Sequence, residues 1–180
     1  MTVGNCQVTL SGTVTITNNK STDGTGSNLY IDKSKGGKIF VLNDSLDSNS
    51  QVVFKDCDNQ YAGTYYISNA DDLNDTKLRC FTTDAGRKFV KAANGQVYVA
   101  TVLEDKPTAQ NLVYNGEEQT GVIATADAGK YYTITGTTAT QANTAYAEGD
   151  ENRSGYTAKV ELEPGYALYH SNTYYVAGIP

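Results

Sequence analysis

Three groups of acidic residues are the first candidates for chemistry in this sequence. They are Asp71, Asp72 and Asp75; Asp56 and Asp58; and Glu148, Asp150 and Glu151. A glycosidase needs two carboxylates about 5–10 Å apart in a cleft, and Ca²⁺ needs several oxygen ligands from one loop. All three groups lie in turn-like sequence, and none has the spacing of an EF-hand. We therefore expect solvated loops here, and no metal-binding residues.

The histidine and the cysteines are the second group of candidates. Nucleophilic catalysis needs an imidazole close to a thiol or hydroxyl group. His170 is the one histidine, and it is distant in sequence from Cys6, Cys57 and Cys80. The sequence therefore predicts no catalytic residue, no cofactor-binding residue and no enzyme. For the cysteines we expect buried, unpaired thiols, with a Cys57–Cys80 disulfide as the alternative.

Glycines and tyrosines could serve binding instead of catalysis. No glycine motif opens a helix as a phosphate site requires, so we interpret the glycines as turn residues. The sequence contains 14 tyrosines and no tryptophan. Three adjacent pairs stand out: Tyr65/Tyr66, Tyr131/Tyr132 and Tyr174/Tyr175. In a strand one ring of each pair faces inward and the other outward, so each pair offers about one exposed ring.

Charge divides the chain into two parts. The net charge is −6, and residues 104–180 carry 4 basic and 10 acidic side chains whereas residues 1–103 carry 10 of each. This shift predicts a domain boundary near Glu104–Pro107. The acidic balance argues against a nucleic-acid partner. No run of 18 apolar residues occurs, so we expect no membrane insertion. Neither end of the chain has the pattern of a signal peptide or an anchor. If the parent is a surface protein, we expect this chain to be an internal piece of it.

The elements that would position these residues are short strands. In the first part, apolar pairs at Val8/Leu10, Leu29/Ile31 and Val52/Phe54 recur with a period in the low twenties, as in a solenoid. We expect these pairs to stack as parallel strands of successive coils. The pattern resembles the last coils of right-handed parallel β-helices in bacterial surface proteins. A second β-sandwich is the competing interpretation.

Residues 61–103 continue in the same style. We expect strands at Tyr65–Ile67, Lys88–Lys91 and Gln96–Val102, with Asn94–Gly95 as a hairpin turn. A short helix over Ala70–Leu78, capped by Ser68 or Asn69, is the one helical candidate. A solenoid end exposes strand edges, so this region is interpreted as a final coil with its cap.

The second part alternates apolar and polar residues in two segments, Leu112–Val122 and Gly155–Tyr166. Each is interrupted by a tight-turn pair, which indicates a small antiparallel sandwich. Strands are expected near residues 110–114, 119–123, 131–135, 156–162, 166–169 and 174–176. The sequence of this part resembles the Ig-like repeats of the MBG type, which occur in secreted and surface-anchored bacterial proteins. It departs from them at Leu168, where the family usually has Trp, and in the longer segment 141–155.

Together these observations predict an all-β protein with two domains. Residues 1–103 would form β-helix terminal coils and a cap, and residues 104–180 an Ig-like β-sandwich. The resemblance implies a non-catalytic structural or adhesive module at a bacterial cell surface, beside further modules of the same parent chain. Its partner would be a host glycan or protein. The alternatives are a fragment of a β-helix polysaccharide-degrading enzyme and a carbohydrate-binding module.

Overall fold

The computed structural model describes residues 2–20, 28–57, 61–113, 115–136, 138–139 and 158–178. These residues are mostly β, which confirms the predicted β-rich class. The helical elements among them are single short turns. They are η1 (Lys33–Lys35), α1 (Gly63–Tyr66), η2 (Ala70–Asp72) and α2 (Asp75–Leu78).

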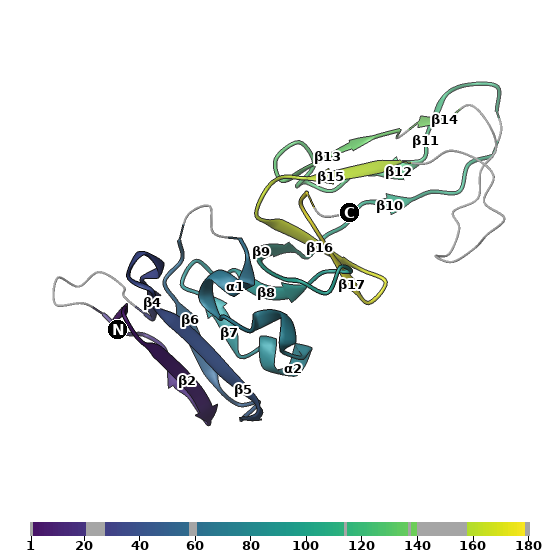
Figure 1. Cartoon of the computed structure of the whole chain (residues 1–180). Helices are drawn as coiled ribbons and strands as arrows, with labels where there is room; N and C mark the ends of the chain where they lie inside the picture. The colour runs from purple at the N-terminus through teal and green to yellow at the C-terminus, as the bar shows by residue number, and fades with distance from the viewer. Residues whose placement is uncertain are drawn as a thin grey trace.

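The chain begins with two successive rounds of three strands. The strands of the first round pair in parallel with those of the second (Figure 1). The pairs are β1 (Thr2–Val3) with β4 (Tyr30–Ile31), β2 (Gln7–Gly12) with β5 (Lys38–Leu46), and β3 (Thr15–Ile16) with β6 (Gln51–Phe54).

The strands are parallel as predicted, and Leu29 forms a parallel bridge with Phe54. The predicted match of Val8/Leu10 with Leu29/Ile31 is wrong. Val8 pairs with Ile39, whereas Ile31 pairs with Val3. The repeat is therefore longer than the low twenties, because one round contains three strands and their connections. The short apolar pairs have similar sequences in all three strands of a round. The spacing of about twenty residues therefore paired strands that occupy different positions in their rounds.

Close backbone approach fixes one corner of these rounds. Gly37 lies so near the preceding round that a Cβ atom there would come within 2.1 Å of the Val3 carbonyl oxygen. The Asp32 amide donates to that same oxygen at 2.9 Å. Only a residue without a side chain fits at position 37, and this lets Val3 and Ile31 pack side by side.

Most of the interior of the first part, residues 2–103, is one continuous apolar cluster. Val90, Ala92, Ala100 and Leu103 belong instead to clusters shared with the second part. The centre of the continuous cluster is aromatic: the ring of Phe54 lies 5.3 Å from that of Tyr66, 6.1 Å from Phe81 and 5.7 Å from Phe89, between centroids. The apolar members of the strands face this cluster, as the period of two requires.

A seven-stranded sheet extends from these rounds to the end of the described chain. Its order is β17-β16-β9-β8-β7-β6-β3. The strands not yet named are β7 (Phe81–Thr83), β8 (Lys88–Lys91), β9 (Val97–Leu103), β16 (Tyr166–His170) and β17 (Thr173–Val176). β8 and β9 are antiparallel around Asn94–Gly95, which confirms the predicted hairpin.

The predicted cap contains more helix than expected. Tyr65–Ile67 is not a strand, since α1 occupies Gly63–Tyr66. This helix begins close to β9, because a Cβ at Gly63 would lie 2.5 Å from a methyl group of Val97. The single helix expected over Ala70–Leu78 is two turns separated at Leu73, whose ψ of 143° is extended.

The caps differ from the prediction for a local reason. Asn74 caps α2, its side chain accepting from the Lys77 amide at 3.0 Å. Ser68 or Asn69 was expected to cap the helix, and Asn69 occupies the N-cap position of η2 without a capping hydrogen bond from its side chain. Its side-chain amide instead bonds the backbone of Val41, accepting at 3.1 Å and donating at 3.0 Å.

Apart from β16 and β17, the described strands of the second part, residues 104–178, form two-stranded antiparallel pairs. They are β10 (Thr108–Ala109) with β12 (Val122–Ile123), β11 (Gln119–Thr120) with β14 (Thr138–Ala139), and β13 (Tyr132–Thr135) with β15 (Lys159–Leu162). The strands expected near residues 131–135, 166–169 and 174–176 are present. The strand expected near residues 110–114 lies slightly earlier in the chain.

The boundary between the two parts stays a prediction. The chain leaves β9 at Leu103 and continues through exposed residues, Glu104 to Lys106. Strand β16, from the second part, returns to pair in parallel with β9, with Tyr166 opposite Thr101. The two parts therefore share one sheet, whether or not each can fold alone.

Candidate functional site

Two pockets open at places where the second part meets the first. The pocket here called the hairpin pocket lies between α2, β8 and the β16–β17 hairpin, with a volume of about 230 Å³. The pocket here called the seam pocket lies beside Arg87 and the Pro164–Gly165 turn, with a volume of about 400 Å³. Each is lined by one acidic residue, Asp75 and Asp56 respectively.

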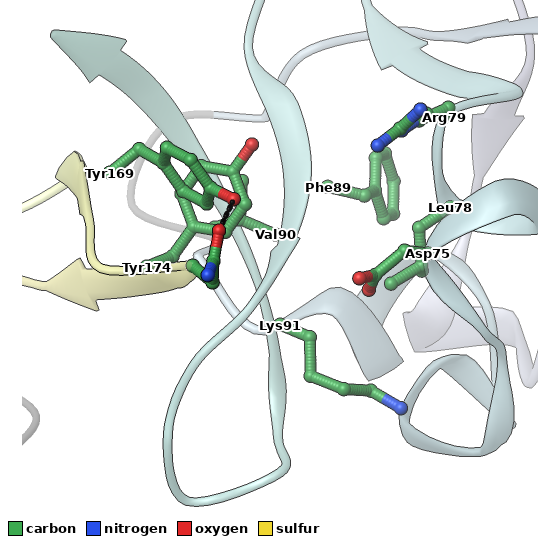
Figure 2. A pocket seen from close by; sticks show the side chains of 9 residues that line it. Asp75, Leu78, Arg79, Phe89, Val90, Lys91, Tyr169 and Tyr174 are labelled. Carbon is green, nitrogen blue, oxygen red and sulfur yellow. Dashed lines mark hydrogen bonds between the residues drawn. The ribbon is translucent and has the colours of Figure 1, made fainter.

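Two tyrosines form one wall of the hairpin pocket (Figure 2). Tyr169 of β16 and Tyr174 of β17 are register partners, so their side chains share a face of the hairpin. Their ring centroids lie 4.8 Å apart and the planes are tilted by 49°. The Tyr169 hydroxyl donates to the Asn172 side-chain oxygen at 3.3 Å. The turn between them holds Ser171 and Asn172 at positive φ, 54° and 60°.

The opposite wall is polar and comes from the α2 region. Asp75 begins α2, and Arg79 follows its last residue; both side chains are exposed. Figure 2 shows them across the pocket from the tyrosines, with Phe89 and Val90 between. The Lys91 ammonium donates to the backbone oxygens of Asp71 at 2.9 Å and Leu73 at 2.8 Å. This fixes the cap beside the pocket.

A buried ion pair forms the base of the seam pocket. The Arg87 Nε donates to Asp56 Oδ2 at 3.0 Å, and Nη2 donates to Asp56 Oδ1 and to the Cys57 carbonyl. Arg87 is only 8% exposed. Burial lowers the pKa of its guanidinium, but the hydrogen bond and charge of Asp56 outweigh this and raise the pKa above its ordinary value. Arg87 needs this partner, because its guanidinium alone would be buried without compensation, whereas Asp56 is half-buried.

Aromatic rings surround this pair. The Arg87 guanidinium lies over the ring of Tyr61, 5.1 Å from its centroid. The Tyr66 hydroxyl donates to Asp56 at 3.4 Å and accepts from the Cys57 amide at 3.2 Å; burial raises its pKa. Gly165, at φ +84°, packs against Tyr61 so closely that a Cβ would lie 2.5 Å from the ring. The seam pocket therefore joins the two parts, and its ring faces are largely used by the protein itself.

The acidic residues considered from sequence have structural partners or solvated positions. Asp71 accepts from the Val97 amide at 2.6 Å, Asp56 pairs with Arg87, and Asp72 and Asp75 are exposed. Asp58, Glu148, Asp150 and Glu151 lie outside the described residues. Within the described part of the chain, no three His, Cys, Asp or Glu side chains are grouped as a metal site would require.

The histidine and the cysteines are apart from one another. His170 is exposed, with its Nδ1 3.1 Å from the Lys106 ammonium nitrogen and its ring 6.3 Å from that of Tyr175. All three thiols are free: Cys80 is buried as expected, but Cys57 is only half-buried and Cys6 is exposed. Burial raises the pKa of the Cys80 thiol, which makes it a poor nucleophile.

In each of the three adjacent tyrosine pairs, one ring is more exposed than the other. Tyr132 is fully buried, whereas its neighbour Tyr131 is half-buried and stacks on Tyr166 with centroids 4.6 Å apart. Tyr175 is 45% exposed. Sequence reasoning missed the cross-strand pair Tyr169/Tyr174. Its signal was present, because the two residues lie at matching distances from the Ser171–Asn172 turn.

Comparison of the chain with protein-family models, with curated proteins and with solved structures finds no match. Across the described residues, no helix has the length and apolar character to cross a membrane.

Proposed function

We propose that this protein is a non-catalytic structural and adhesive module of a secreted or wall-attached bacterial protein. In this proposal, β-helix coils and an Ig-like repeat space or present a binding region outside the cell. The observation that carries the proposal is the combination of parallel rounds with a sheet that continues into the second part. Stacked rounds give an elongated element with few internal degrees of freedom, which suits a spacer.

The positions of the carboxylates support a non-catalytic role. Hydrolysis of a glycosidic bond needs an acid and a second carboxylate on opposite sides of that bond. Each of the two pockets is lined by one acidic residue, and Asp56 is already paired with Arg87. The same pockets offer tyrosine and arginine side chains, which are frequent in binding surfaces.

The activity part of the proposal is tested with the purified chain. It is incubated with pectin, xylan and mucin while reducing ends are measured, and it is applied in parallel to arrays of glycans and extracellular-matrix proteins. We expect binding to at least one array component, no release of reducing ends, and an unchanged melting temperature in EDTA. Release of reducing ends would overturn the non-catalytic role, and an array without any bound component would overturn the adhesive role.

The location is tested on intact cells of the source organism. An antibody raised against the chain should label unbroken cells or the culture medium, and external protease should remove the cell-bound label. Labelling only after lysis would refute the extracellular setting.

A further inference from the structure

We propose that the hairpin pocket binds one neutral six-membered sugar ring of a glycan. The proposal rests on the adhesive role above and assigns it a site and a ligand class. It is carried by the pocket's two unlike walls, an aromatic one from Tyr169 and Tyr174 and a polar one with Asp75 and Arg79, which lie on either side of strand β8 (Figure 2).

The aromatic wall suits the C–H face of a sugar ring. Tyr169 is 46% exposed, so part of its ring is available to a ligand. The ring is also held in place, by its contact with Tyr174 and by the hydrogen bond to Asn172. A side chain that is already ordered loses less entropy when a ligand stacks on it. The wall is therefore accessible and pre-organised.

The polar wall suits hydroxyl groups. Asp75 offers an acceptor and Arg79 offers donors in a fixed fork, while each sugar hydroxyl can both donate and accept. The Lys91 ammonium is engaged by the backbone oxygens of the cap. The lining holds one carboxylate, Asp75, and two cations, Arg79 and Lys91, and the whole chain has a net charge of −6. This mixture of donors and acceptors matches the hydroxyl groups of a neutral ring.

The size of the pocket sets how much of a glycan enters it. Pockets for drug-sized ligands have volumes of about 300–1,000 Å³, and the hairpin pocket, at about 230 Å³, is smaller. One sugar ring fits this scale. The rest of a glycan chain would remain in solvent, so the affinity of a single site should be low.

The test uses methyl glycosides of glucose, galactose, mannose and N-acetylglucosamine at millimolar concentration. Binding to the full chain is followed by chemical-shift changes in amide NMR spectra. We expect at least one glycoside to shift amides of β16, β17 and α2. Tyr169→Ala should lower the affinity for that glycoside at least tenfold, and Arg79→Gln should lower it at least threefold. Tyr169→Phe, which keeps the ring, should stay within about threefold of the parent chain.

The matched control is Tyr175→Ala. Tyr175 is as exposed as Tyr169, at 45%, and is the next residue after Tyr174, so it faces the other side of the hairpin. Its substitution should leave the affinity unchanged. Melting temperatures of all variants verify that they remain folded.

Three outcomes overturn the proposal. They are the absence of any shift at the pocket, equal affinity loss in Tyr169→Ala and Tyr175→Ala, and stronger binding of methyl glucuronide than of every neutral glycoside. The adhesive role is judged separately on the arrays. Array binding that persists in Tyr169→Ala refutes this pocket and leaves adhesion standing, whereas pocket shifts without array binding support the pocket and refute adhesion.

Discussion

The two parts of the molecule differ in how they obtain a core. In the first part, aromatic and branched side chains from every strand pair meet in one cluster. In the second part, Val113 is 80% and Ile123 52% exposed. Ala167 and Val176 pack against residues of the β8–β9 region, whereas Leu168 belongs to a small cluster with Leu103 and Tyr132. The second part therefore has only a small core of its own and gains further stability by docking onto the first, and the comparison predicts where substitutions will cost most.

The largest effect is expected from truncation of the shared aromatic core. Phe54→Ala should lower the free energy of unfolding by about 4 kcal/mol, because Phe54 is fully buried among three other rings. Leu112→Ala in the second part should cost about 2 kcal/mol, near the lower end for a buried leucine. Urea denaturation measures both. Equal losses would show that the second part has a core comparable to the first.

A smaller loss is expected at the buried ion pair. Asp56→Ala leaves the Arg87 guanidinium buried without its partner and should cost about 3 kcal/mol. Addition of Arg87→Met in the same chain removes the stranded charge and should restore much of that loss. The result that contradicts this account is a double variant less stable than Asp56→Ala alone.

The docking contact itself is tested at Gly165. Gly165→Ala should cost about 2 kcal/mol, since it combines a positive φ with a clash against Tyr61. Gly178→Ala is the control, because Gly178 has φ +74° and open space around it, and it should cost about 1 kcal/mol. If thermal melts give the two variants the same melting temperature, Tyr61 does not restrain the second part.

The smallest effect is expected at alkaline pH. Burial, with a hydrogen bond to Cys57, raises the pKa of Tyr65 to about 12 from an ordinary 10.0. Above pH 10 the unfolded chain loses this proton first, so the free energy of unfolding falls as pH rises toward 12. Tyr65→Phe should make this fall shallower, whereas Tyr175→Phe, which removes an exposed hydroxyl, should not. Urea midpoints of the parent chain and of both variants, measured from pH 9 to pH 12, test this difference.

Local features of the fold were predictable because neighbouring residues determine them. Asn94–Gly95 specifies its hairpin by turn chemistry, and Gly95 has the expected positive φ of 80°. The parallel rounds were predictable in kind, since apolar pairs recur, but their register was not. Register depends on which strand of a round each pair occupies, and the segments between strands carry no apolar pattern that reveals it.

The candidate site was less predictable than the strands. Tyr169 and Tyr174 could have been paired from their positions about a turn. Their approach to Arg79 could not, because it depends on β16 joining β9 instead of a strand of the second part. Sequence alternation shows that a strand has one apolar face and does not show which sheet that face will cover.

The sheet becomes complete only when β16, which comes late in the sequence, pairs with β9. Strands β1 to β9 find all their other partners within the first part, so that part can complete its pairing while residue 166 is still to come. Until then, the edge of β9 that will receive β16 is open, and an open strand edge accepts any suitable chain. Two molecules refolding at high concentration can thus exchange their β16–β17 hairpins and emerge as an intertwined dimer.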